Sequence, residues 1–80
     1  MSWPNSRDEL RSAIALAIGE PDNAFSDDDL LMDVGLDSVR AMMLILEWRK
    51  AGLEVALPSF GVEPTVNGWW RVIEAAKADR

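Results

Sequence analysis

The sequence predicts an all-α fold: a small helical bundle with three main helices, one short helix and a long first loop. Two observations support it. Three segments repeat apolar residues at the spacing of one helix face, each beginning at a capping residue. The only alternating segment, Leu53–Leu57, would be a single short strand without a partner. We expect one domain over residues 1–80, with a core from about 6 to 78.

The first helix is predicted from Arg7 to Ile18. Ser6 and Glu9 form a capping box at its start, and Gly19 followed by Pro21 ends it. Its apolar face is formed by Leu10, Ala13, Ile14, Ala17 and Ile18.

A loop over residues 19–37 follows, and loops of this length usually have a function of their own. Ser26–Asp29 is expected to cap a single helical turn, and Gly35 suits a tight turn with positive φ. The expected apolar anchors of the loop are Phe25, Leu30, Leu31 and Val34. Because the connection is long, we expect the helices on either side of it to run roughly parallel.

The second helix is predicted from Ser38 to Ala51, with Asp37 as its N-cap and Gly52 just past its end. Such a helix is either packed on several sides or keeps an exposed apolar patch for a partner, because apolar residues cover more than half of its circumference. These residues are Val39, Ala41, Met42, Met43, Leu44, Ile45, Leu46 and Trp48.

A short helical turn is expected near Pro58–Val62, and Thr65 is the predicted N-cap of the last helix. Gly68 lies inside that helix and weakens it slightly. Its apolar positions are Val66, Trp69, Trp70, Ile73 and Ala76. The tryptophans of the chain are expected to pack in the core and at its rim rather than to form a ligand cage; they are Trp3, Trp48, Trp69 and Trp70.

The sequence has no cysteine and no histidine, which excludes disulfides, a thiolate metal site and a serine–histidine triad. A calcium loop fails because Leu31 stands at the ligand position that follows Asp27 and Asp29. No apolar run approaches the roughly 20 residues of a membrane span, and the N-terminus lacks the features of a signal peptide. We expect a cytoplasmic protein that is not an enzyme, and the sequence leaves open whether it is free-standing or part of a larger protein.

The net charge of −6 is concentrated in the long loop, because seven acids and no base lie between Glu20 and Asp37. This field should repel nucleic acid and anionic membrane and attract basic protein surfaces. Alternatively, the acids only keep the loop solvated. We expect that reversing the charge of Asp27, Asp28 and Asp29 slows a partner reaction while leaving the helices intact.

Ser38 stands where the acidic loop meets the second helix. From the residues alone, two interpretations remain open. Serine is a common helix-capping residue. A hydroxyl at a helix N-terminus is also well placed to carry a phosphate ester, because the positive end of the helix dipole favours the anion. The second interpretation suits a serine that another enzyme modifies.

The stretch Gly35-Leu36-Asp37-Ser38-Val39 resembles the phosphopantetheine attachment motif of acyl, peptidyl and aryl carrier proteins. Taken with Arg40, Met42, Trp48-Arg49, Pro64-Thr65 and Trp69-Trp70, it is similar to the aryl carrier domains of siderophore-type nonribosomal peptide synthetases. The same domain occurs at the C-terminus of the bifunctional isochorismatase/aryl carrier proteins. The resemblance extends from about Glu9 to Ala76 and implies the four-helix carrier-protein bundle.

The resemblance implies that a phosphopantetheinyl transferase, with Mg²⁺, attaches 4′-phosphopantetheine from coenzyme A to Ser38. The thiol would take an aryl acid of the salicylate or 2,3-dihydroxybenzoate type from an adenylating enzyme and pass it to a condensation or cyclisation domain. Asp37 would meet the metal site of the transferase. The implied partner-contact residues are Arg40, Met42, Met43, Leu57 and Gly61.

We expect an aryl carrier that acts as a monomer. Two alternative functions remain open. A peptidyl or fatty-acyl carrier is one, and a fatty chain would need a cavity that Trp48 and Met43 would either fill or line. The other is an acidic helical adaptor that binds its partner without a covalent bond, with Ser38 only capping the helix.

Overall fold

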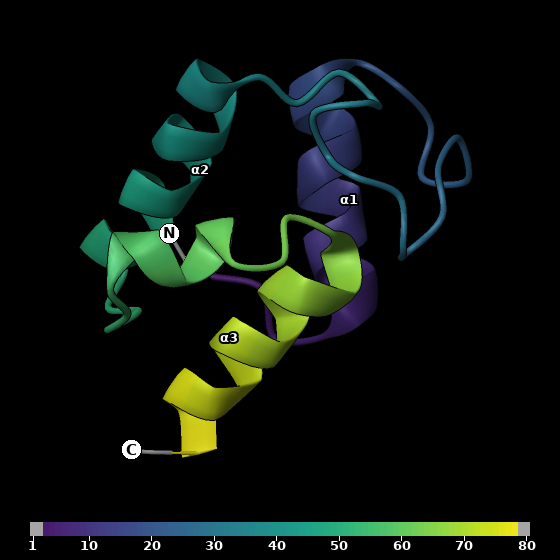
Figure 1. Ribbon diagram of the computed structural model, residues 1–80. Coiled ribbons are helices and arrows are strands. Elements are labelled where there is room, and N and C mark those ends of the chain that lie inside the picture. The colour runs from purple at the N-terminus through teal and green to yellow at the C-terminus, as the bar shows by residue number, and fades with distance from the viewer. Residues whose placement is uncertain (1–2, 79–80) are drawn as a thin grey trace.

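The computed structural model describes residues 3–78, and all regular structure in that range is helical. The elements are α1 (Arg7–Ile18), α2 (Ser38–Lys50), the 3₁₀ helix η1 (Leu57–Gly61) and α3 (Val66–Ala78) (Figure 1). The predicted all-α fold, with three main helices and one short one, is confirmed. The second helix ends at Lys50, one residue before the predicted end.

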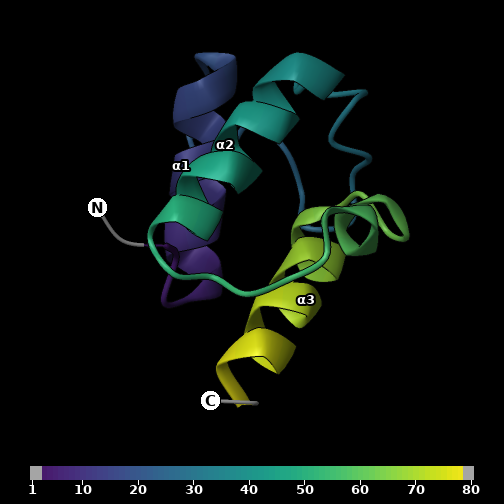
Figure 2. The same cartoon turned by 90° about the vertical axis from the view of Figure 1, so that its left-hand side faces the viewer.

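The predicted parallel arrangement of the first two helices is wrong. Figures 1 and 2 show α2 running back in roughly the opposite direction to α1. The first turn of α2 starts beside the last turn of α1, where Arg40 Nη1 donates a hydrogen bond to the Ala17 carbonyl oxygen at 3.4 Å. The loop uses its length to reach the start of α3 before it returns, so a long connection did not require parallel helices.

Side-chain caps begin each of the three main helices as predicted. The Glu9 amide donates to Ser6 Oγ at 3.1 Å, although the Glu9 carboxylate accepts from the Asn5 amide instead of completing the box on Ser6. At α3, the Gly68 amide donates to Thr65 Oγ1 at 2.9 Å. These caps satisfy backbone donors that have no partner inside a helix.

An aromatic cluster fills the interior between α2, η1 and α3. The ring centroids of Trp48 and Trp69 lie 6.0 Å apart, edge to face, and Phe60 contacts both rings. The Trp69 indole N–H donates to the Phe60 carbonyl oxygen at 2.9 Å. Trp3 and Trp70 are half-buried against the core. The predicted packing role of the tryptophans is confirmed.

Residues 19–37 cross the bundle as turns without a helix. Ser26 Oγ accepts from the Asp28 amide, and the Ser26 amide donates to the Asp29 carboxylate, so the predicted cap forms but closes only a turn. The Leu31 amide donates to the Pro64 carbonyl oxygen at 2.9 Å, which ties the loop to the segment before α3. Leu30 was a wrong anchor, being 49% exposed, whereas Leu36 is fully buried.

Candidate functional site

Ser38 is the first residue of α2, and its side chain is exposed. The capping role belongs to Asp37, whose carboxylate accepts a hydrogen bond from the Arg40 amide at 2.8 Å. Within residues 3–78, the Ser38 hydroxyl has no hydrogen-bond partner. The interpretation of Ser38 as a helix cap is therefore wrong, and its hydroxyl is available to another molecule.

The turn before Ser38 is held in place by Gly35 and Leu36. Gly35 has φ +110°, as predicted, a conformation that residues with a side chain rarely adopt. The Leu36 amide donates to the Leu31 carbonyl oxygen at 3.0 Å, and the Leu36 side chain is fully buried. Burial of Leu36 on one side of the turn leaves the next two residues at the surface.

Helix α2 keeps an exposed apolar strip next to Ser38. The strip consists of Val39, Met42, Met43 and Leu46, which are 68%, 45%, 61% and 42% exposed. Of the two possibilities predicted for this helix, the exposed patch is the one observed. Exposed apolar side chains gathered on one helix are typical of a surface that meets a protein partner.

Three of the predicted partner residues surround a hollow of about 190 Å³ that begins at Ser38. Met42 lines it from α2, and Leu57 and Gly61 line it from η1. Met32 lies on the same rim, half exposed, and was missed by sequence reasoning. In the sequence, Met32 only extends the apolar pair Leu30-Leu31, and this does not mark it as a site residue.

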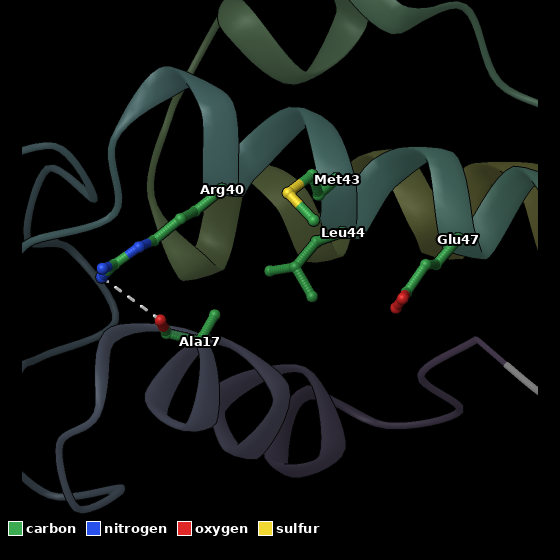
Figure 3. A pocket seen from close by; sticks show the side chains of 5 residues that line it. All are labelled: Ala17, Arg40, Met43, Leu44 and Glu47. Atoms are coloured by element: carbon green, nitrogen blue, oxygen red, sulfur yellow. Dashed lines mark hydrogen bonds between the residues drawn. The ribbon is translucent and has the colours of Figure 1, made fainter.

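Arg40 and Met43 line a different hollow from Met42, although Met43 belongs to the same exposed strip. This hollow of about 380 Å³ lies between α1 and α2, and Ala17, Leu44 and Glu47 complete it (Figure 3). Arg40 Nε is 3.8 Å from the Asp37 carboxylate, so one guanidinium contacts both the cap of α2 and the end of α1. The predicted partner residues are thus divided between two hollows, one on each side of the exposed strip of α2.

The acids of the loop have two different roles. Asp27 accepts a hydrogen bond from Arg11, Asp28 accepts one from Asn67, and Asp29 accepts one from the Ser26 amide. These three hold the loop in shape, so reversing their charge would not test electrostatics alone. Glu20 and Asp33, by contrast, are exposed and have no ion-pair partner within residues 3–78.

In the described part of the chain, no group of three or more acidic side chains is placed to hold a metal ion. No helix there is long and apolar enough to cross a membrane.

Comparison with known proteins places these features in one family. The family model described as "Phosphopantetheine attachment site" matches residues 8–73. The chain is 40% identical to enterobactin synthase component B of Escherichia coli (strain K12) over 70 residues, which are 88% of this chain and 24% of that protein.

Two further relatives cover most of this chain. Isochorismatase of Bacillus subtilis (strain 168) is 35% identical over 82% of this chain and 21% of its own length. Phenyloxazoline synthase MbtB of Mycobacterium sp. (strain MCS) is 34% identical over 92% of this chain and 6% of its own length. The chain thus spans at most about a quarter of these relatives. No solved structure gives a significant match. Because the family model covers most of the chain and the fold agrees, the chain belongs to the phosphopantetheine-attachment family of carrier proteins, whose members carry covalently bound 4′-phosphopantetheine.

Proposed function

We propose that Ser38 is the attachment site and that the chain is an aryl carrier protein. One observation carries the assignment: the Ser38 hydroxyl is exposed at the start of α2 and has no hydrogen-bond partner within residues 3–78, because Asp37 caps the helix. A serine whose role was only to cap the helix would use its hydroxyl to accept a hydrogen bond from a backbone amide.

The attachment step uses one atom of this chain, Ser38 Oγ. It attacks the β-phosphate of coenzyme A, a new O–P bond forms, and the bond from phosphorus to 3′,5′-ADP breaks. The serine proton passes to a base of the transferase, since this chain has no histidine to accept it. The free N–H groups at the start of α2 favour the phosphodiester anion that results.

Asp37 combines two tasks in this proposal. One carboxylate oxygen caps α2, yet the side chain is 61% exposed, which leaves it accessible to the Mg²⁺ of the transferase. Once attached, 4′-phosphopantetheine supplies a thiol that holds the cargo as a thioester. The chain itself performs no turnover in this scheme.

We assign the cargo as an aryl acid of the salicylate or 2,3-dihydroxybenzoate type. The names of two relatives, an enterobactin synthase component and a phenyloxazoline synthase, support siderophore-like nonribosomal peptide biosynthesis. The interior supports a short cargo over a fatty chain. Trp48, Phe60 and Trp69 pack against each other where an acyl chain would enter between α2 and η1. Met43 lies outside, on the exposed strip.

The proposed partners are a phosphopantetheinyl transferase, an aryl-adenylating enzyme and a condensation or cyclisation domain. The hollow bounded by Met42, Leu57 and Gly61, together with the exposed strip of α2, offers these partners an apolar surface beside Ser38. Residues 1–80 would act as one monomeric carrier domain in the cytoplasm, with contact to neither nucleic acid nor membrane.

The experiment that separates a carrier from a non-covalent adaptor is a mass measurement. The protein is incubated with coenzyme A, Mg²⁺ and a promiscuous phosphopantetheinyl transferase, and the intact chain is weighed. We expect one added phosphopantetheine group on the wild type and none on Ser38→Ala. A wild-type mass that stays unchanged beside a carrier that the same transferase modifies would contradict the proposal.

The cargo is tested on the modified protein. Salicylate, 2,3-dihydroxybenzoate, amino acids and fatty acids are each offered with ATP and a matching adenylating enzyme, and thioester formation is measured. We expect loading by the aryl acids. Loading by amino acids or fatty acids alone would contradict the aryl assignment while leaving the carrier assignment intact.

A further inference from the structure

Arg11 connects α1 to the acidic loop through three acceptors. Its guanidinium donates to the Asp27 carboxylate at 2.5 Å, to the Phe25 carbonyl oxygen at 2.5 Å and to the Asp22 carbonyl oxygen. It also lies over the Phe25 ring, 4.7 Å from the ring centroid. The Arg11 side chain is only 16% exposed. Arg11 therefore holds the loop at Asp22, Phe25 and Asp27, and Ser12 adds one hydrogen bond from its hydroxyl to the Asp22 carboxylate at 2.5 Å.

The anchored segment is coupled in turn to the residues that precede Ser38. The Asp27 carbonyl oxygen accepts from the Asn67 amide at 3.1 Å, which attaches the same point to the start of α3. Phe25 shares a hollow with Asp33 and Val34, the residues just before the Gly35 turn. Leu31 is attached to the segment before α3 through the Pro64 carbonyl oxygen, and its own carbonyl oxygen accepts from the Leu36 amide, so hydrogen bonds connect the region that Arg11 holds to the turn before Ser38.

We propose that Arg11 is a positioning residue for the modification of Ser38. It touches neither Ser38 nor the incoming phosphate, and acts by holding the loop over residues 19–37 in the arrangement that the transferase must bind. The inference rests on the proposed attachment of phosphopantetheine to Ser38. It adds a role for a residue of α1, which lies outside the motif around the serine.

The geometry requires arginine at this position. A planar guanidinium can donate in several fixed directions at once, whereas the single ammonium of lysine is a point charge that cannot span three separated acceptors. Arg7 provides a matched control on the same helix. It approaches the same Asp27 carboxylate, but at 3.8 Å and with 51% of its side chain exposed, so its replacement should matter little.

The test compares Arg11→Lys and Arg7→Lys in phosphopantetheine transfer, using the whole chain, coenzyme A, Mg²⁺ and one transferase. For R11K we expect the KM for the carrier to rise about tenfold with kcat nearly unchanged, as when only about a tenth of the molecules hold the competent loop. Amide hydrogen exchange should become faster within residues 22–36 and stay unchanged in α2. R7K should match the wild type in both measurements.

Asp27→Asn is a second variant that removes the charged acceptor while keeping its size, and it should shift KM in the same direction. Circular dichroism shows whether each variant is folded at the assay temperature. A wild-type KM in folded R11K and folded D27N would overturn the inference, as would unchanged exchange within residues 22–36. Absence of modification in the wild type would instead refute the proposed function, so the two failures are distinguishable.

Discussion

Replacing Gly68 by alanine should destabilise the domain, although alanine favours a helix over glycine by about 1 kcal/mol. A Cβ atom at this position would lie 2.0 Å from the Glu63 carbonyl oxygen and 2.7 Å from the Glu63 Cβ. Both distances are far below van der Waals contact, and the nearest atom belongs to the backbone. Glycine at position 68 thus permits the chain before α3 to cross the start of that helix closely.

The expected loss of stability is the difference between the cost of overpacking and the gain in helix propensity. Overpacking of a filled interior costs about 1–3 kcal/mol, and a clash with backbone belongs in the upper part of that range. Subtracting the gain of about 1 kcal/mol in helix propensity leaves a loss of about 1–2 kcal/mol. For a domain of this size, that loss lowers Tm by roughly 5–15 °C. A shift of Glu63 would also disturb the neighbouring Pro64 carbonyl, which accepts from the Leu31 amide.

Thermal unfolding followed by circular dichroism measures this effect. Gly61→Ala is the control, because Gly61 is exposed, has no positive φ, and offers open space to a Cβ atom. Its free energy of unfolding should stay within about 0.5 kcal/mol of the wild type. If G68A melted at or above the wild-type temperature while G61A behaved as expected, the close approach of Glu63 would not be what requires glycine at position 68.

Three further predictions concern the aromatic cluster, the helix cap and the acidic loop. Trp69→Phe removes the hydrogen-bond donor to the buried Phe60 carbonyl oxygen and should lower the free energy of unfolding in urea by about 1–3 kcal/mol. A loss near zero would mean that a water molecule replaces the indole N–H as donor. Asp37→Ala should cost about 1 kcal/mol, whereas Asp37→Asn keeps a capping oxygen and should stay close to the wild type; equal losses would show that the charge, not the cap, is what stabilises α2. The double variant Glu20→Lys/Asp33→Lys should keep the helical circular dichroism signal but slow phosphopantetheine transfer several-fold at low salt, less so at high salt. Equal rates at all salt concentrations would assign the two acids to solvation alone.

Helix positions were predictable from the sequence because their signals are local. Ser6, Asp37 and Thr65 each accept a hydrogen bond from an amide three residues further along, and such short-range chemistry does not depend on the rest of the fold. The motif around Ser38 was likewise a local signal. The start of α2 was therefore predicted to the residue.

The features that sequence reasoning missed depend on contacts between distant parts of the chain. In the sequence, Asp27 and Asp28 look like solvated charges. The folded structure shows that they accept hydrogen bonds from Arg11 and Asn67. Leu30 and Leu31 are equivalent in the sequence, but in the fold Leu31 is fully buried and its backbone bonds to Pro64 and Leu36, whereas Leu30 is 49% exposed. The direction of α2 relative to α1 follows from the same long-range anchors.

The proposed function requires that the free hydroxyl of Ser38 carries the phosphopantetheine group. The most direct measurement is peptide mapping by mass spectrometry after transfer from coenzyme A, with Ser38→Ala and Ser59→Ala treated in parallel. We expect the added group on the peptide that contains Ser38, no added group in S38A and an unchanged added group in S59A. A group found on another residue, or one that persists in S38A, would show that Ser38 is not the attachment site.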